Sequence, residues 1–270
     1  MHCRFFAVLV ACCVLGSGLA GAADDPPPAA KPRWNSVFGG ELHANVTFTT
    51  DYAKSGISST QNQPAFQAGV DWHSPYLLAN GPPLRVYVTA FGSNVSFNTV
   101  GAGEEIDLSA GLKFRPFKKL GIDAGYIRYL YPSYAADLGY EYGEYSLKVD
   151  YDFGPLYVSG RLRYSPDTIN HAGQTWEKRA LVSVPLDFLP PLPGGAKLSV
   201  YGALGNTWVE KPNILELPGN EFWFWQIGLV TSAWGLDLTL AYTDTNIEVS
   251  GCGNTRACAG RFFASISKVF

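Results

Sequence analysis

The sequence predicts an all-β protein, a transmembrane antiparallel β-barrel of about twelve strands. Twelve runs of about ten residues place apolar side chains at one parity and polar side chains at the other. Because successive side chains of a strand point to opposite faces, each run has one apolar and one polar face. The polar rows carry charges of both signs, the apolar rows carry almost none, and the chain ends on Phe270 inside the last run. This pattern is typical of barrels that face lipid outside and a polar lumen inside.

The composition supports a barrel and excludes two other classes of protein. Of the 270 residues, 47% are hydrophobic and 14% are aromatic, which favours β-structure. Beyond the N-terminus no apolar run reaches the roughly 18 residues that a membrane-spanning helix needs, so helical membrane proteins are excluded. The formal net charge is −3, and no basic segment indicates nucleic acid as a partner.

The N-terminus has the form of a secretory signal peptide. Arg4 supplies the positive charge, residues 5–19 form an apolar core, and Ala-Gly-Ala at 20–22 is a small-residue cleavage site. A lipoprotein signal ending at Cys12 is disfavoured, because the apolar core before Cys12 is short and the residues after it stay apolar. We therefore expect a signal peptide over 1–23, a proline-rich periplasmic lead-in over 24–38 and the barrel over 39–270.

The alternating runs define twelve expected strands. Residues 155–165 are the clearest example, with Leu156, Val158 and Leu162 on one face and Arg161 and Arg163 on the other. The expected strands span 41–51, 63–73, 84–97, 104–115, 120–131, 140–152, 155–165, 175–187, 196–208, 220–231, 235–246 and 260–270. Their number is even, as in bacterial barrels formed from one chain.

The connections alternate between short and long, which predicts the orientation in the membrane. The short ones are 115–119, 152–155 and 232–235, and the long polar ones are 53–62, 132–139, 166–174, 210–219 and 247–260. Short periplasmic turns and long extracellular loops are the rule in such barrels. Two connections on the short side, 74–83 and 188–195, are longer than expected but rich in Pro and Gly.

Parity assigns the outer face of most strands. The residues expected to face lipid are Leu42, Val46, Phe48, Phe66, Val70, Trp72, Ile106, Leu108, Leu112, Phe114, Leu147, Val149, Tyr151, Leu236, Leu238, Leu240, Tyr242, Phe262, Ile266 and Phe270. Strand 220–231 is apolar on both faces, so its parity is ambiguous. Its Trp and Phe cluster fits either an interfacial aromatic girdle or ordinary core packing.

The polar rows supply the candidate functional residues. Arg161, Arg163 and Arg179 form one group, and Glu105 and Asp107, together with other acids of the first four strands, form another on the opposite wall. Opposed walls of this kind would create a transverse field across a pore. The alternative, which we favour slightly, is that the charges pair locally. For this pairing Glu144, Lys148 and Asp150 adjoin Arg161 and Arg163, and Glu177 adjoins Arg179. The other acids of the opposite wall are Glu41, Asp51 and Asp71.

No catalytic, cofactor-binding or metal-binding motif is expected. A lipid hydrolase needs a nucleophilic Ser beside a His with an orienting partner, and none of His2, His43, His73 and His171 stands in a His-x-Ser arrangement. His43 with Glu41 or Asp51 fits a solvated lumen cluster better than an active site.

Two cysteines remain after the expected leader. Cys252 and Cys258 lie in the last long loop of an exported chain, which predicts a disulfide that closes a short loop.

Several stretches resemble a known family. They are 46–52 (VTFTTDY), 56–58 (GIS), 64–71 (PAFQAGVD), 92–95 (GSNV), 105–108 (EIDL), Tyr131-Pro132, Glu144-Tyr145, Asp244-Thr245 and the final Phe270. Together they resemble the TorF-type porin family of bacterial outer-membrane proteins. The resemblance implies a twelve-stranded barrel in the outer membrane of a Gram-negative bacterium, with Phe270 recognised by the barrel-assembly machinery as a terminal insertion signal. Lys268 departs from the pattern because it lies in the lipid-facing row, where a long side chain near the interface can snorkel.

The function we expect is passive diffusion of small solutes through a porin-like channel surrounded by outer-membrane lipid. The alternative is a closed structural or interaction barrel that displays its loops outside. A lipid-modifying enzyme is the least favoured class.

Overall fold

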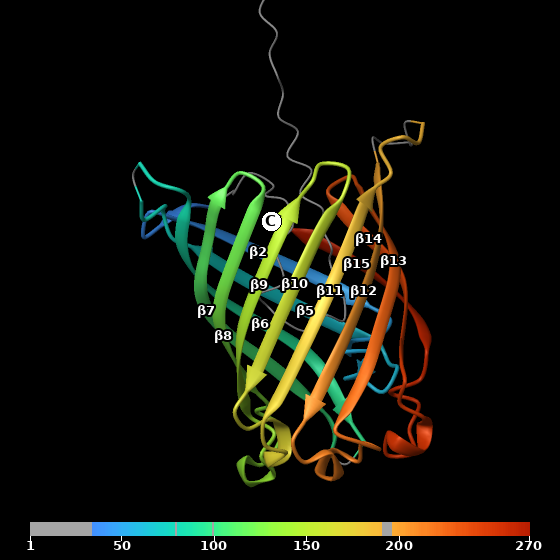
Figure 1. Ribbon diagram of the computed structural model, residues 1–270. Helices are drawn as coiled ribbons and strands as arrows, with labels where there is room; N and C mark the ends of the chain where they lie inside the picture. Colours follow the sequence, from blue (N-terminus) through green and yellow to red (C-terminus); the bar gives the residue numbers. More distant parts are fainter. Residues whose placement is uncertain (1–33, 79, 99, 191–195) are drawn as a thin grey trace, which may run out of the picture.

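The strands form a closed antiparallel barrel (Figure 1). The computed structural model describes residues 34–78, 80–98, 100–190 and 196–270, with side chains from residue 38 onward. The barrel strands are β2 (Gly40–Thr49), β5 (Ala65–His73), β6 (Leu84–Phe97), β7 (Gly101–Phe117), β8 (Leu120–Leu130), β9 (Tyr142–Asp152), β10 (Tyr157–Ser165), β11 (Thr175–Pro185), β12 (Lys197–Val209), β13 (Glu221–Ala233), β14 (Leu236–Thr245) and β15 (Arg261–Val269). The twelve-stranded barrel predicted from the sequence is confirmed, and the largest boundary shift is at β7, which begins at Gly101 rather than at 104.

Smaller elements lie in the connections. They are β1 (Trp34–Val37), β3 (Ala53–Lys54), β4 (Ile57–Ser58) and the 3-10 helices η1 (Ala136–Leu138), η2 (Ile169–His171), η4 (Pro212–Leu215) and η5 (Val249–Gly251). None of the helices in the described residues is long and apolar enough to cross a membrane.

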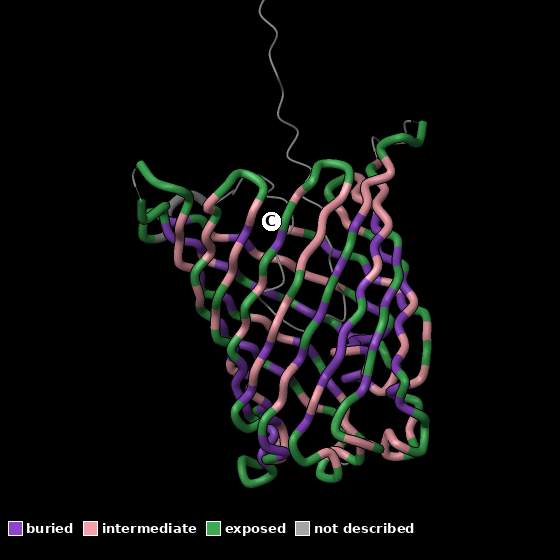
Figure 2. Tube along the Cα trace, in the orientation of Figure 1, coloured by how far each residue is buried: buried purple, intermediate pink, exposed green. Residues whose placement is uncertain are grey.

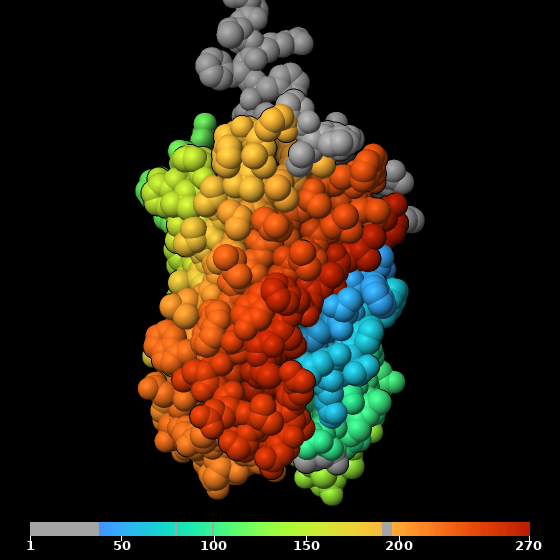
Figure 3. Space-filling model, turned by 90° about the vertical axis from the view of Figure 1, so that its right-hand side faces the viewer, coloured from blue at the N-terminus to red at the C-terminus, as the bar shows by residue number. Residues whose placement is uncertain are grey.

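The first and last barrel strands close the sheet. β2 pairs with β5 on one side and with β15 on the other, with Phe48 opposite Ile266. Figure 3 shows this seam, where the red C-terminal strands lie against the blue N-terminal strand. Closure leaves no barrel strand with an unpaired edge, which a sheet in lipid requires.

Burial alternates along the strands (Figure 2). The outer rows expose many large apolar side chains, among them Phe48, Phe66, Val70, Leu108, Leu112, Leu147, Leu240 and Phe262. The inner rows are mostly buried and hold most of the polar side chains, together with an apolar cluster formed by Leu181, Tyr201, Ala203, Val230, Ala241 and Phe263. An apolar belt of this size around a protein marks a lipid-facing surface. The parity expected from the sequence therefore holds.

β13 combines both interpretations of its aromatic cluster. Trp223 and Trp225 are exposed on the outer face, whereas Phe222 and Phe224 are buried on the inner face. Their pairing partners on β12 and β14 establish this register. The outer pair fits a membrane-interface position, and the inner pair belongs to the packed interior.

The two ends of the barrel differ as expected. The short turns 118–119, 153–156 and 234–235 lie at one end, together with β1, and the longer loops with the 3-10 helices lie at the other (Figure 1). β1 pairs antiparallel with β2, with Trp34 opposite Leu42. The end of the predicted lead-in is thus strand-paired rather than free, while residues 1–33, including the predicted signal peptide, lie outside the described residues.

The terminal residue supports one prediction about assembly. Phe270 is exposed, and its backbone N–H donates to the carbonyl of Ala44 at 2.8 Å. Deleting Phe270 is expected to lower the amount of heat-modifiable barrel in outer-membrane fractions, because the family resemblance implies that the assembly machinery reads this residue. Phe262→Ala, an exposed aromatic residue of the same strand, is the control and should assemble normally. Normal levels of the deletion variant would contradict the insertion signal.

Candidate functional site

Residues 50–64, which we call the inserted segment, connect β2 to β5 and fold into the barrel. Thr49 and Ala65 are direct partners in the ladder, so a short turn would be enough to join the two strands. The segment is much longer, and Tyr52 and Thr60 within it are almost inaccessible to solvent. The expectation that 53–62 is an exposed external loop is therefore wrong. The physical reason is that this segment finds polar and aromatic partners inside the barrel.

The inserted segment touches strands from all sides of the bore. Tyr52 contacts β7, the Lys54 side chain contacts β9, and the hydroxyl of Ser55 donates to Glu177 of β11. The carbonyl of Ser59 accepts from the backbone N–H of Ser96 in β6. The segment therefore crosses the bore at the end that carries the long loops.

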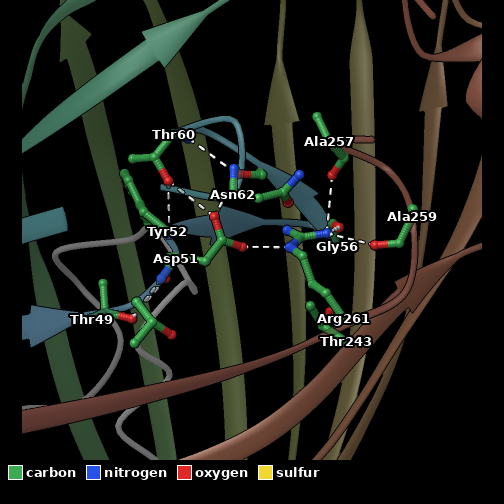
Figure 4. A network of polar contacts seen from close by, with 12 residues as sticks. Thr49, Asp51, Tyr52, Gly56, Thr60, Asn62, Thr243, Ala257, Ala259 and Arg261 are labelled. Carbon is green, nitrogen blue, oxygen red and sulfur yellow. Dashed lines mark hydrogen bonds and ion pairs between the residues drawn. The ribbon is translucent and has the colours of Figure 1, made fainter. Parts of the chain in front are cut away.

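Asp51 anchors the segment (Figure 4). Its Oδ2 accepts from Nε of Arg261 at 2.5 Å, and its Oδ1 accepts from the hydroxyls of Ser58 at 2.5 Å and Thr60 at 3.0 Å. Nη1 of Arg261 donates to three backbone carbonyls, those of Gly56, Ala257 and Ala259. Charge-assisted hydrogen bonds of this kind are among the strongest polar contacts, so one Asp–Arg pair ties the segment to the last strand and the last loop.

Glu105 on β7 holds the segment from a second part of the barrel wall. Its two carboxylate oxygens accept from the hydroxyls of Tyr52 and Tyr131, each at 2.5 Å. Burial, followed by the negative charge of Glu105, raises the pKa of Tyr52 well above its ordinary value. The Tyr52 phenol therefore stays protonated and remains a hydrogen-bond donor.

Lys54 brings a positive charge into an aromatic cluster. Its Nζ lies 3.4 Å from the ring centroid of Tyr129 and donates to the hydroxyl of Tyr142 at 2.5 Å. The hydroxyl of Tyr129 in turn donates to Glu144 at 2.8 Å. Sequence reasoning missed this cluster, because inward-facing Tyr side chains look like ordinary strand residues.

The structure places the predicted lumen residues on the inward-facing rows of four strands. They are Glu105 and Asp107 on β7, Glu144 and Lys148 on β9, Arg161 and Arg163 on β10, and Arg179 on β11. Arg161 Nη2 lies 3.5 Å from Glu177 Oε1, and Arg163 Nε lies 3.9 Å from Glu144 Oε2. Lys148 stands opposite Arg161 in the ladder. The Arg163–Glu144 contact is local pairing of the expected kind. Glu177 was expected beside Arg179 but contacts Arg161, and Lys148 is a like-charged neighbour of Arg161.

The acidic wall is also partly neutralised. Glu41 pairs with Arg85 at 3.0 Å, and Asp51 pairs with Arg261. Neither arginine was among the expected partners. Arg261 comes from β15, which meets β2 only when the barrel closes, and Arg85 lies two strands away from Glu41 in the sheet.

Asp107 and Arg179 are buried charged groups with more than one polar atom that lacks a hydrogen-bond partner among the described residues. Both carboxylate oxygens of Asp107 lack a donor, and Nε and Nη2 of Arg179 lack an acceptor. Asp107 is fully buried, and Arg179 is 8% exposed. Burying a charge in a dry interior without hydrogen-bond partners costs several kcal/mol of folding free energy. Water or a charged solute in this part of the bore would remove that cost.

The other half of the bore holds several partly exposed polar side chains. Asn45, Lys113, Asp123, Lys148 and Ser159 face inward and are partly exposed. They belong to the half of the barrel nearer the short turns. These side chains leave part of the inner surface of that half accessible to solvent.

The loops at the narrow end carry two further predicted features. Cys252 and Cys258 form a disulfide, as expected, with their Cα atoms 6.1 Å apart. Nδ1–H of His171 in η2 donates to Oδ2 of Asp167 at 2.8 Å on the exposed surface. This hydrogen bond lowers the pKa of Asp167.

Comparison with solved structures finds other membrane barrels. The NanC porin is 10% identical with a TM-score of 0.47, covering 84% of this chain and 98% of its own. The KdgM porin is 8% identical with a TM-score of 0.46, covering 84% and 99%. LpxR from Salmonella typhimurium is 11% identical with a TM-score of 0.44, covering 84% and 99%. With scores below 0.5, none of the three bears on the activity of this chain.

Comparison by sequence gives a family. No curated protein matches the chain. A family model described as "Bacterial protein of unknown function (Gcw_chp)" matches residues 35–270, which is the whole barrel and most of β1. The chain therefore belongs to the Gcw_chp family of bacterial proteins of unknown function.

Proposed function

We propose that the protein is a narrow, passive channel for small polar solutes in a bacterial outer membrane, with no enzymatic role. The observation that carries the proposal is a pair of buried ionisable side chains, Asp107 and Arg179, whose polar atoms lack hydrogen-bond partners among the described residues, inside a barrel whose outer face is apolar. Water in the bore would satisfy both groups, whereas a dry interior would leave them at low dielectric. A hydrated bore through a closed barrel is a diffusion path.

The inserted segment would set the size limit of this path. It crosses the bore where Glu105 and Asp107 face the strands that carry Arg163 and Glu177. A solute would pass between the segment and these charged side chains. Narrow passages lined by both signs of charge favour small, polar or zwitterionic solutes over apolar ones.

A closed structural barrel is the second candidate, and one observation favours it. The side chains beside the inserted segment are almost inaccessible to solvent, with Glu105 at 1% and Arg163 at 3% exposed. A barrel filled in this way would anchor the external loops, including the disulfide loop, without conducting.

Liposome swelling separates the two candidates. The refolded protein is reconstituted into vesicles, and small zwitterionic amino acids or disaccharides are supplied outside under an osmotic gradient. The channel predicts swelling with the amino acids that falls sharply as solute size increases. Vesicles that behave like protein-free controls with every solute would support the closed barrel.

The orientation of the barrel gives a separate prediction. Single cysteines placed at Lys211 or Ile214, in the loop with η4, are expected to react with an impermeant maleimide on intact cells, because long loops face the exterior. Cysteines at Lys118 or Phe153, in the short turns, should react only after the outer membrane is opened. The reverse labelling pattern would invert the topology.

A further inference from the structure

We propose a transition-metal site formed by Glu41, His43 and His73 in the bore, at the end opposite the inserted segment. Each residue offers one ligand atom, and these atoms all lie within 4.8 Å of one another. The site is independent of the proposed channel activity, since it rests on different residues in the other half of the barrel.

The strand register builds the site. Glu41 and His43 are two residues apart on β2, so both side chains point to the inner face. His73, the last residue of β5, is the direct ladder partner of Glu41. Two rigid, hydrogen-bonded strands therefore hold three donors on one surface, which is the kind of scaffold that a metal site requires.

The His73 imidazole is unusual for a buried histidine. It is 1% exposed, and neither Nδ1 nor Nε2 has a hydrogen-bond partner among the described residues. Buried polar atoms in proteins are nearly always satisfied, so two unsatisfied ring nitrogens in one side chain require an explanation. The His43 ring, also buried, lies 5.8 Å away between centroids, and Tyr87 packs edge-on against His73 at 6.3 Å. A bound cation would use a nitrogen of each ring.

The donor set matches known metal chemistry. Two imidazoles and one carboxylate are a ligand set of zinc sites that keep a further position for water or another ligand. Imidazole also suits Ni²⁺ and Cu²⁺, whereas Mg²⁺ and Ca²⁺ prefer sites made of oxygen atoms. The site should therefore select zinc-like transition metals against alkaline-earth ions.

Nearby carboxylates favour a bound cation, and nearby cationic side chains compete with it. Three carboxylates, Glu41, Asp71 and Asp123, and two cations, Arg85 and Lys113, face this part of the bore, and their sum is −1 when both histidines are neutral. Arg85 Nη1 holds Glu41 Oε2 at 3.0 Å. A metal ion bound to Glu41 would displace the Arg85 guanidinium from this carboxylate. The Arg85 side chain is 23% exposed, so it can move into solvent. Arg85 is thus a competitor of the metal.

Zinc titration of protein purified in folded form from membranes, without an affinity tag, tests the site. After chelator treatment, calorimetry is expected to show one Zn²⁺ bound per chain. His43→Gln and His73→Gln should each weaken binding at least about tenfold, an effect that loss of even an outer-shell partner can have. His171→Gln, which alters an exposed loop histidine, is the matched control and should bind as the parent does. Each variant is first checked for heat-modifiable migration.

Two results keep the test decisive if a variant folds poorly. Arg85→Gln is expected to bind Zn²⁺ more tightly than the parent, an outcome that misfolding does not produce. Co²⁺ added to the parent protein should give visible absorption bands that Zn²⁺ abolishes. A parent protein that binds no Zn²⁺, or a His43→Gln/His73→Gln double variant that binds it with unchanged affinity, would overturn the proposal.

Discussion

Replacing residues 53–62 with a short Gly-Ser linker is expected to raise ion conductance several-fold. The replacement removes Lys54, Ser55 and the β3–β4 hairpin from the bore while keeping Asp51 and its contact with Arg261. Thr49 and Ala65 are adjacent in the ladder, so the shortened connection still joins β2 to β5. Single-channel recording in planar bilayers measures the change.

The control shortens a different loop at the same end of the barrel. Residues 211–216, around η4, are exposed or half-buried, and Leu217, which packs against the buried Phe222 and Phe224, is kept. Replacement of residues 211–216 by the same linker should leave conductance unchanged. Equal conductance of the 53–62 variant and the parent would show that the inserted segment is not the constriction.

Removing the three lumen arginines is expected to shift ion selectivity strongly toward cations. Arg161→Gln, Arg163→Gln and Arg179→Gln together leave Glu144 and Glu177 on the wall, with Glu105 and Asp107 opposite. In a water-filled bore these carboxylates remain solvated, so the reversal potential in a salt gradient moves while thermal stability changes little. In a dry interior each uncompensated carboxylate would instead destabilise the barrel by about 3–5 kcal/mol.

A matched variant separates a local effect from net charge. Lys118→Gln, Lys119→Gln and Lys211→Gln also remove three positive charges, but from exposed connections outside the bore. This variant should keep the reversal potential of the parent, because exposed charges are screened by salt. An identical shift in both triple variants would mean that the arginines do not line the path.

The sequence predicted the barrel because the relevant information is local. Alternation within each run determines which residues, such as Leu147 and Leu240, face outward, and this parity does not depend on the distant partners of the strand. The disulfide was also predictable from local sequence, since Cys252 and Cys258 are close together in one loop of a chain with a predicted signal peptide.

The inserted segment was not predictable in this way. Residues 53–62 have the polar, turn-rich composition of an exposed loop, and their burial depends on Arg261 and Glu105, which are far away in the sequence. The cluster of Glu41, His43 and His73 was missed for a similar reason, because only the register of β2 against β5 brings His73 opposite Glu41. Side-chain pairing across the bore is a property of the closed barrel rather than of any single strand.

The most direct test of the central claim is the conductance of the unmodified, refolded protein in a planar bilayer, recorded beside the 53–62 linker variant. A hydrated bore narrowed by the inserted segment predicts a small, steady conductance for the parent and a larger one for the variant. A silent parent together with a silent linker variant would contradict the channel and leave the closed barrel as the function of this fold.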